Sequence, residues 1–194
     1  MAFKAFRIKQ VDGAIEAGFE QLEINDLSAG EVVVRVQYSG INYKDALAAT
    51  GKGRITRVPA VNGGVDLVGV VDSSTDERFH GGDAVLVCGA GLSETLDGGY
   101  SEFARVPGDA VVPLPSGLTT WEAGALGTAG FTAALAMMRM EDNHQDPVLG
   151  PIVVTGATGG VGSFAIDMLA AKGFEVLAFT GKSEQHDYLR TLGA

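Results

Sequence analysis

The pattern of apolar and polar residues in the first half of the chain predicts a β-rich domain. Apolar and polar residues alternate along residues 31–41, where Val32, Val34 and Val36 share one face, as expected of a half-buried strand. Four other stretches are apolar or alternating, and glycine pairs bound several of them. The expected strands cover residues 3–11, 31–41, 65–72, 83–87 and 100–106. Short strands separated by glycine are typical of a barrel-like fold.

Two further segments follow a helical pattern. A short helix is expected at Tyr43–Thr50, and Gly51 directly after it is a residue that commonly ends helices. Beyond a cluster of prolines, a longer helical run begins at Thr119. Its glycines indicate close backbone packing, with a break near Gly127–Thr128. The polar segment 141–151 is then expected to be a surface connection.

The stretch after this connection combines a strand, a glycine-rich turn and a helix. Residues 152–154 are β-branched, as a fully buried parallel strand requires. The turn leads into a helical pattern at 164–172, and a second strand is expected at 175–180. Together these elements predict a βαβ unit.

The glycine-rich turn matches a dinucleotide-binding motif. Residues 157–162 read ATGGVG, which fits G-x-G-x-x-G with alanine at the first position. Gly159 would let the backbone approach a pyrophosphate, Gly162 would let the helix pack close to the strand, and the N–H groups of the helix start would face the anion. A ligand-free turn is the alternative. The candidate cofactor-binding residues are Thr158, Gly159, Gly160, Val161 and Gly162.

The loop after the second strand favours NADPH over NADH. An NAD site usually has a carboxylate there for the ribose 2′-hydroxyl, but this chain reads Thr180, Gly181, Lys182, Ser183 and has no carboxylate before Glu184. Lys182 could pair with a 2′-phosphate whose oxygens Thr180 and Ser183 could meet. In the alternative interpretation Lys182 is a solvated turn residue.

Composition and charge exclude several classes of protein. With 194 residues, 46% hydrophobic and 20% charged, the chain can bury a core and has room for one domain and part of another. The net charge of −10 and the absence of a Lys/Arg cluster argue against a nucleic-acid surface. No signal peptide or apolar run of membrane length is present. The single cysteine, Cys88, fits a reducing cytosol.

Several motifs resemble those of the medium-chain dehydrogenase/reductase superfamily. The similarity is to its zinc-independent acrylyl-coenzyme A reductase and quinone oxidoreductase-like subfamily, and it covers the whole chain. The matching segments are GINYKDAL at 40–47, TGKG at 50–53, GTAGFTA at 127–133, VVTGATGGVGS at 153–163 and YLRTLGA at 188–194. The resemblance implies an α/β fold in which a GroES-like β-rich domain, residues 1–118, precedes an incomplete Rossmann domain, a doubly wound parallel sheet, at 119–194.

The resemblance also implies an NADPH-dependent reductase that works without a metal. Relatives with catalytic zinc carry Cys where this chain has Asn42 and His where it has Val65, and their structural zinc needs four cysteines. The three histidines here lack a ligand-like spacing. The implied reaction adds a hydride to the β-carbon of an enoyl thioester such as acrylyl-coenzyme A and returns a proton at the α-carbon, while charge develops on the thioester oxygen.

Four residues are candidates to meet the substrate or the nicotinamide. Tyr43 starts the short helix and, by resemblance, lies beside the nicotinamide, in a catalytic and cofactor-binding role; packing at a domain boundary is the alternative. Asn42 either orients the substrate or caps the helix. Asp66 begins an apolar strand and needs partners if buried, in a catalytic or a structural role. Thr128 either meets the nicotinamide or a phosphate, or only marks a helix break.

The sequence is also compatible with two other functions. The same scaffold could reduce quinones or free enones. A chain that lacks the later strands of the nucleotide fold could instead be a truncated, non-catalytic nucleotide-binding or interaction module, because its half-formed sheet exposes an edge. For a full-length parent, the resemblance implies a small-molecule substrate, a homodimer and a cytoplasmic location.

Overall fold

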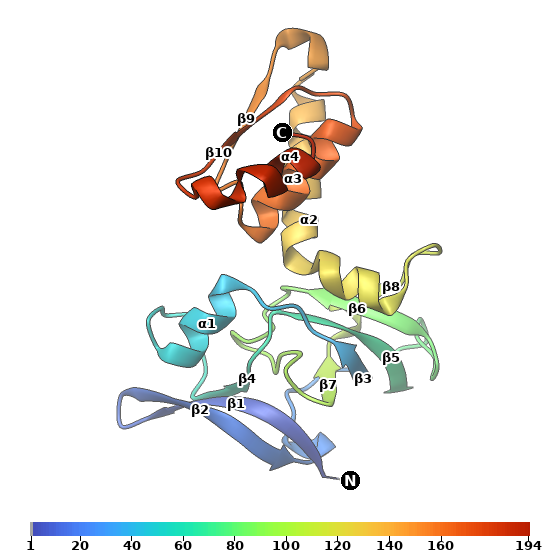
Figure 1. Cartoon of the computed structure of the whole chain (residues 1–194). Helices are drawn as coiled ribbons and strands as arrows, with labels where there is room; N and C mark the ends of the chain where they lie inside the picture. Colours follow the sequence, from blue (N-terminus) through green and yellow to red (C-terminus); the bar gives the residue numbers. More distant parts are fainter. Residues whose placement is uncertain (1) are drawn as a thin grey trace. The chain divides into compact units, whose positions relative to one another are not determined.

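The computed structural model describes residues 2–194 and divides into two compact units, which are described separately (Figure 1). The first unit extends to Thr128 and the second runs from Ala129 to Ala194, so the boundary falls inside helix α2, Thr120–Asp142. Each unit has its own sheet and its own apolar core. The boundary between the GroES-like and Rossmann domains, expected at residues 118/119, stays a prediction.

The first unit consists of two antiparallel sheets. The three-stranded sheet has the order β2-β1-β4, and the five-stranded sheet has the order β7-β3-β5-β6-β8. The strands are β1 Phe3–Val11, β2 Ala14–Leu22, β3 Val32–Tyr38, β4 Ala60–Asn62, β5 Asp66–Ser74, β6 Ala84–Cys88, β7 Phe103–Val106 and β8 Val112–Pro113. The five strands predicted from the sequence are confirmed, with small differences at their ends.

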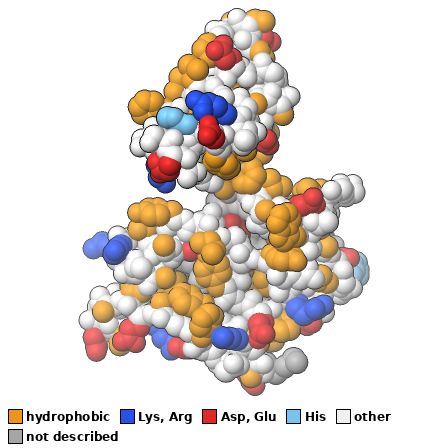
Figure 2. Space-filling view, viewed as in Figure 1, with side chains coloured by type: hydrophobic (Ala, Val, Ile, Leu, Met, Phe, Trp, Pro, Cys, Tyr) orange, Lys and Arg blue, Asp and Glu red, His pale blue; other side chains and the backbone are white. Residues whose placement is uncertain are grey.

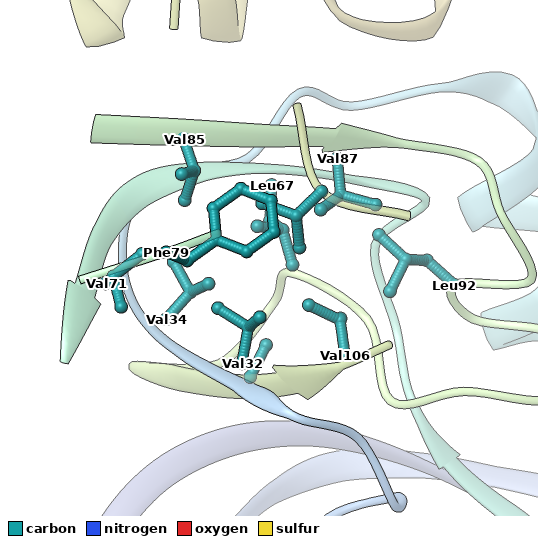
Figure 3. Close-up of a cluster of buried hydrophobic side chains, with 11 residues drawn as sticks. Val32, Val34, Leu67, Val71, Phe79, Val85, Val87, Leu92 and Val106 are labelled. Carbon is teal, nitrogen blue, oxygen red and sulfur yellow. The ribbon is translucent and has the colours of Figure 1, made fainter. Parts of the chain in front are cut away.

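The five-stranded sheet carries the core of the first unit. Val32 and Val34 of β3 are fully buried and Val36 packs partly buried against them, which confirms the predicted face of this strand. Figure 3 shows how side chains from several strands and Phe79 converge on one apolar centre. The cluster consists of Val32, Val34, Leu67, Val71, Phe79, Val85, Val87, Leu92, Ala104, Val106 and Val111.

Three strands, β2, β4 and β8, lie outside the sequence prediction. Strand β2 pairs with β1 along all 9 of its residues. The connecting residues Asp12 and Gly13 have φ values of 49° and 84°, the combination that a type I′ hairpin turn requires. The Asp-Gly pair is therefore the signal that could have predicted this hairpin. The apolar pattern could not, because the side chains of β2 are mostly exposed.

Helix α1, Tyr43–Thr50, is confirmed with its predicted bounds. Asn42 is the N-cap residue, and its backbone N–H donates to Asp45 Oδ2 at 2.7 Å. Gly51 ends the helix in the left-handed conformation at φ 68°, which glycine adopts without steric cost.

Helix α2 is broken where the sequence predicts a break. Gly127 has φ 44° and ψ −152°, a region that is open essentially only to glycine. The helix continues to Asp142, so the predicted surface connection at 141–151 begins in helix. Within residues 2–194, no helix is both long and apolar enough to cross a membrane. Short 3₁₀ turns occur at Ile24–Asp26, Gly108–Ala110, Pro147–Leu149 and Ser183–Gln185.

The second unit is a βαβ unit followed by a short helix. Strands β9, Ile152–Thr155, and β10, Val176–Phe179, are parallel, with Val153 opposite Leu177. Helix α3, Gly160–Ala171, connects them, and helix α4 is His186–Thr191. The predicted start of α3 at residue 164 was wrong, because Gly160 and Gly162 already belong to the helix. The packing of the fold overrides the low helix propensity of these two glycines.

One face of the β9–β10 pair is packed and the other is open. Val154 and Val176 are buried in a cluster with Ile166 of α3. On the opposite face Val153, Leu177 and Phe179 are 60%, 48% and 70% exposed. A doubly wound sheet has helices on both faces. The open face of β9–β10 is therefore a face that helices cover in a doubly wound sheet.

Cys88 ends β6 beside a buried carboxylate. It pairs across the sheet with Asp66, which is 1% exposed. Burial and the negative charge of Asp66 raise the pKa of the Cys88 thiol to about 12. Because the thiolate is the reactive form, Cys88 should react slowly in the folded protein.

We expect native Cys88 to be alkylated by iodoacetamide at pH 8 about a hundredfold or more slowly than the same cysteine in guanidinium chloride. Its folded-state pKa exceeds the unfolded value, so the free energy of unfolding should also fall as the pH rises above about 9. Mass spectrometry of a quenched time course measures the rate. Equal rates in the two states would contradict the raised pKa.

Candidate active-site residues of the two units

The glycine-rich turn of the second unit forms the start of helix α3. After Thr155 the chain turns at Gly156, which has φ 60°, and Gly159 is the N-cap residue of the helix. The Gly159 N–H donates to the Gly156 carbonyl at 2.9 Å, and the Ser163 N–H donates to the Gly159 carbonyl at 2.8 Å.

Two glycines of this turn are needed for different reasons. A Cβ at Gly162 would lie 2.5 Å from Gly156 O and 2.8 Å from Ala157 Cα, so only glycine fits there. A Cβ at Gly159 would approach only Gly156 O, at 3.2 Å, and its φ of −81° is accessible to any residue. The protein's own packing therefore excludes a side chain at Gly162, whereas a Cβ at Gly159 would require a shift of only a few tenths of an ångström.

The start of helix α3 offers backbone donors to an anion. The amides of Gly160, Val161 and Gly162 precede Ser163, which makes the first bond back to the N-cap carbonyl. A glycine N-cap has no side chain to satisfy them. Helix α3 has 12 residues, so its dipole adds positive potential at this end. The half-buried Thr158 and the exposed Gly160 line a hollow of about 460 Å³ beside the turn.

The loop after β10 begins at the same sheet edge as the glycine-rich turn. Thr155 and Phe179 are paired at the ends of the two parallel strands, and the Ala157 N–H donates to Phe179 O at 3.5 Å. In the loop, the Lys182 N–H donates to Thr180 Oγ1 at 3.1 Å. The Lys182 side chain is exposed and, within the part of the chain that the structure describes, forms no salt bridge. Gly181 and Ser183 are also exposed.

In the first unit the structure brings Asn42, Asp66 and Thr128 together. Asp66 Oδ2 accepts a hydrogen bond from Asn42 Nδ2 at 2.8 Å. Asp66 Oδ1 accepts two from Thr128, from its N–H at 3.0 Å and from its hydroxyl at 2.5 Å. Because Thr128 gives its hydroxyl proton to Asp66, it cannot also donate that proton to a phosphate.

A second buried carboxylate, Asp45, is not among the site residues predicted from the sequence. Asp45 is 4% exposed and accepts from the N–H groups of Asn42 at 2.7 Å and Val65 at 3.0 Å, and from the Tyr100 hydroxyl at 3.0 Å. Lys44 pairs with Glu94 instead. The third helical position after an Asn N-cap is the capping-box position, which is the signal that could have identified Asp45.

The surroundings of Asp45 keep Tyr100 protonated. Burial, followed by the negative charge of Asp45, raises the pKa of the Tyr100 phenol above its ordinary value. Its hydroxyl also lies 3.1 Å from the Gly40 carbonyl, just before the start of α1. The Tyr100 hydroxyl therefore contacts both the segment before α1, at Gly40, and the first turn of α1, at Asp45.

Tyr43 takes no part in this buried network. Its side chain is 81% exposed, and that of Ile41 is 89% exposed. The intervening Asn42 is the residue that connects to both buried carboxylates. The start of α1 therefore presents two large side chains to the surface while its polar groups are fixed from inside.

The remaining titratable side chains are dispersed over the part of the chain that the structure describes. In the described part of the chain, no group of three His, Cys, Asp or Glu side chains could hold a metal ion. His80, His144 and His186 are exposed and far apart in sequence. On the face shown in Figure 2, Lys and Arg side chains are separated from one another and interspersed with Asp and Glu.

Comparison with protein families and curated proteins identifies relatives. Residues 28–116 match the alcohol dehydrogenase GroES-like domain. Acrylyl-CoA reductase AcuI of Ruegeria pomeroyi is 50% identical over 183 residues, which are 94% of this chain and 55% of that protein. The Bacillus subtilis protein named "Putative quinone oxidoreductase YhfP" is 45% identical over 192 residues, which are 99% of this chain and 58% of that protein. The chain thus spans a little over half the length of these relatives.

Solved structures agree with these sequence relationships. The YhdH oxidoreductase of Salmonella enterica, in complex with NADP, is 48% identical with a TM-score of 0.95, and the match covers 98% of this chain and 59% of that one. Bacillus subtilis YhfP with bound NAD is 45% identical with a TM-score of 0.96, over 100% of this chain and 59% of that one. The resemblance and the α/β fold class inferred from the sequence are confirmed. The chain belongs to the medium-chain dehydrogenase/reductase superfamily, in the group that contains acrylyl-CoA reductase AcuI and YhfP.

Proposed function

We propose that this chain is the front part of an NADPH-dependent oxidoreductase that reduces the C=C bond of an enoyl thioester such as acrylyl-CoA by hydride transfer, without zinc. The observation that carries the proposal is the glycine-rich turn at the start of α3. Packing excludes a side chain at Gly162 but only crowds one at Gly159, so a ligand that approaches the backbone would supply the further reason for glycine at 159.

The second unit supplies the groups that fit the phosphates of NADPH. The amides of Gly160, Val161 and Gly162 fit a pyrophosphate, with Thr158 at the edge of the adjoining hollow. The Lys182 side chain, which forms no salt bridge within residues 2–194, fits a 2′-phosphate together with Thr180, Gly181 and Ser183. Relatives support both parts, since NADP is bound to Salmonella YhdH and NADPH to Escherichia coli YhdH.

The first unit supplies the polar groups proposed for the reaction. NADPH, when bound, supplies the hydride that is added to the β-carbon of the substrate. The exposed Tyr43 hydroxyl and the Asn42 amide are the candidate donors to the thioester oxygen, where negative charge develops. The segment that carries them is held by Asp45 and Asp66, so the donors are fixed before a ligand arrives.

Two other functions are each favoured by one observation. Reduction of quinones or free enones is favoured by the name of YhfP, a relative that is 45% identical. A non-catalytic nucleotide-binding or interaction module is favoured by the open face of β9–β10, where Val153, Leu177 and Phe179 are exposed. The resemblance also supports, as parts of the proposal, a small-molecule substrate, a homodimer at full length and a cytoplasmic location.

Replacing the two glycines separately tests the cofactor site. Gly159→Ala should leave the free energy of unfolding within about 0.5 kcal/mol of the parent and abolish the rise in melting temperature that NADPH produces. Gly162→Ala should lower the free energy of unfolding by about 1–3 kcal/mol, because its Cβ would overlap backbone atoms. Thermal and denaturant unfolding with and without NADPH measure both. Undiminished NADPH stabilisation of Gly159→Ala would remove the pyrophosphate from this turn.

Lys182 is expected to select NADPH. Lys182→Ala should weaken NADPH binding about tenfold, the loss of one charge-assisted hydrogen bond, and leave NADH binding unchanged. Lys182→Arg should retain most of the preference. The control is Lys172→Ala, since Lys172 lies on the surface of the same unit and pairs with Glu141. Fluorescence titration at constant ionic strength measures the affinities, and an equal effect on both nucleotides would contradict the assignment.

Substrate preference separates the two enzyme functions. The proposed function expects faster NADPH oxidation with acrylyl-CoA than with 1,4-benzoquinone, followed at 340 nm. Tyr43→Phe should reduce the rate with acrylyl-CoA about tenfold and leave stability unchanged, because the Tyr43 side chain is 81% exposed. An unaltered rate would remove Tyr43 from the site. Binding of NADPH without turnover of either substrate would favour the non-catalytic alternative.

A further inference from the structure

Asp66 contacts two of the candidate site residues while being closed off from solvent. Its side chain is 1% exposed, and its two oxygens bind Asn42 on one side and Thr128 on the other. A substrate outside the unit therefore cannot touch this carboxylate. We infer that Asp66 is a positioning residue, which fixes Asn42 and Thr128 for the reaction and does not itself contact the substrate. This inference rests on the proposed function.

The Asp66 carboxylate depends on its hydrogen bonds, because no cation among the described residues neutralises its charge. Within residues 2–194, Asp66 forms no salt bridge, and its oxygens accept from a side-chain amide, a backbone N–H and a hydroxyl. A buried carboxylate that loses one of a few neutral donors is strongly destabilised. The positions of Asn42 and Thr128 are therefore fixed by the need to solvate this charge.

The carboxylate also determines which way these groups face. A carboxylate oxygen is only an acceptor, so Asn42 must turn its NH₂ group toward Asp66 Oδ2. Thr128 must point its hydroxyl proton toward Oδ1. The same atoms thus set the orientation of the N-cap residue of α1 and of the residue after the break in α2.

The break in α2 is what makes this contact possible. In a continuous helix the Thr128 N–H would donate to the carbonyl of Gly124, four residues earlier. At the break this N–H reaches Asp66 instead. A Cβ at Gly127 would lie 2.7 Å from Asp66 Oδ2, so glycine is needed for the carboxylate to fit as well as for the backbone angles.

A double-mutant cycle on the 194-residue chain tests the contact without any ligand. Asp66→Asn places an NH₂ group against the donors of either Asn42 or Thr128. Asn42→Ala removes the Asn42 donor, so the amide at position 66 can then turn its oxygen toward Thr128. We expect the two effects on the unfolding equilibrium constant to be non-additive by about tenfold or more, which is about 1.4 kcal/mol. The matched control is Asp97→Asn with Asn42→Ala. Asp97 is as buried but binds Arg7, Ser28 and Asn62, so these effects should add. Additivity of the Asp66 cycle would overturn the inference.

A nucleotide comparison tests whether the positioning serves the reaction. Asp66→Asn should weaken NADPH binding about tenfold and change the affinity for adenosine 2′,5′-bisphosphate, which lacks the nicotinamide, by less than twofold. Asp97→Asn should leave both affinities within twofold, although it also lowers stability. Equal effects of Asp66→Asn on both probes, or no effect on either, would overturn a role at the nicotinamide end.

Thr128 provides a second route to the same result. Two variants of this residue decide the question if Asp66→Asn does not fold. Thr128→Ser keeps the hydroxyl, so its affinities for both probes should lie within twofold of those of the parent. Thr128→Val should lose affinity for NADPH only. Equal behaviour of the Ser and Val variants would count against the inference. If the parent chain binds neither probe, the proposed function fails together with this inference, which rests on it. If the parent binds both probes and Asp66→Asn shows no selective loss of NADPH affinity, the inference alone fails.

Discussion

The first unit depends on the hydrogen bonds of two buried carboxylates. A buried carboxylate that no cation neutralises must accept hydrogen bonds from neutral donors. Asp45 and Asp66 are both buried and, within the described residues, neither forms a salt bridge. Their donors come from the start of α1, the start of β5, the tyrosine before β7 and the break in α2. Because unmet buried charge is so unfavourable, these four segments are fixed relative to one another. Asn42 is bonded to both carboxylates and is the centre of the arrangement.

The second unit differs in this respect. Within residues 2–194, the first N–H groups of helix α3 have no hydrogen-bond partner. A glycine N-cap cannot satisfy the first amides of α3, and the tight approach at Gly162 holds the helix start against the turn. A rigid helix end with available N–H groups has a physical reason to attract an anion. The first unit therefore has buried carboxylates that accept hydrogen bonds from its own donors, and the second unit has a helix start that can bind an anion.

Most helices and strands could be predicted because neighbouring residues in the sequence determine them. The apolar face of β3, the bounds of α1 and the break at Gly127 follow from alternation, capping and backbone angles. The hairpin partner β2 was missed because it is mostly exposed, so hydrophobic periodicity carries little signal. The start of α3 was misplaced because glycine propensity suggests a turn, whereas the fold continues the helix through it.

The buried network could be predicted only in part, because its bonds span long sequence separations. Asn42 and Asp66 were singled out as candidates, but their contact joins residues 24 positions apart, and the contact of Asp66 with Thr128 spans 62. No local periodicity encodes such pairs. Asp45 is buried although its neighbour Lys44 is charged, because Lys44 pairs with Glu94 instead. Once the carboxylates have taken the inward-facing donors, Tyr43 and Ile41 remain as large exposed side chains that no packing in the unit explains. Their exposure leaves the Tyr43 side chain accessible to the ligand proposed for the start of α1.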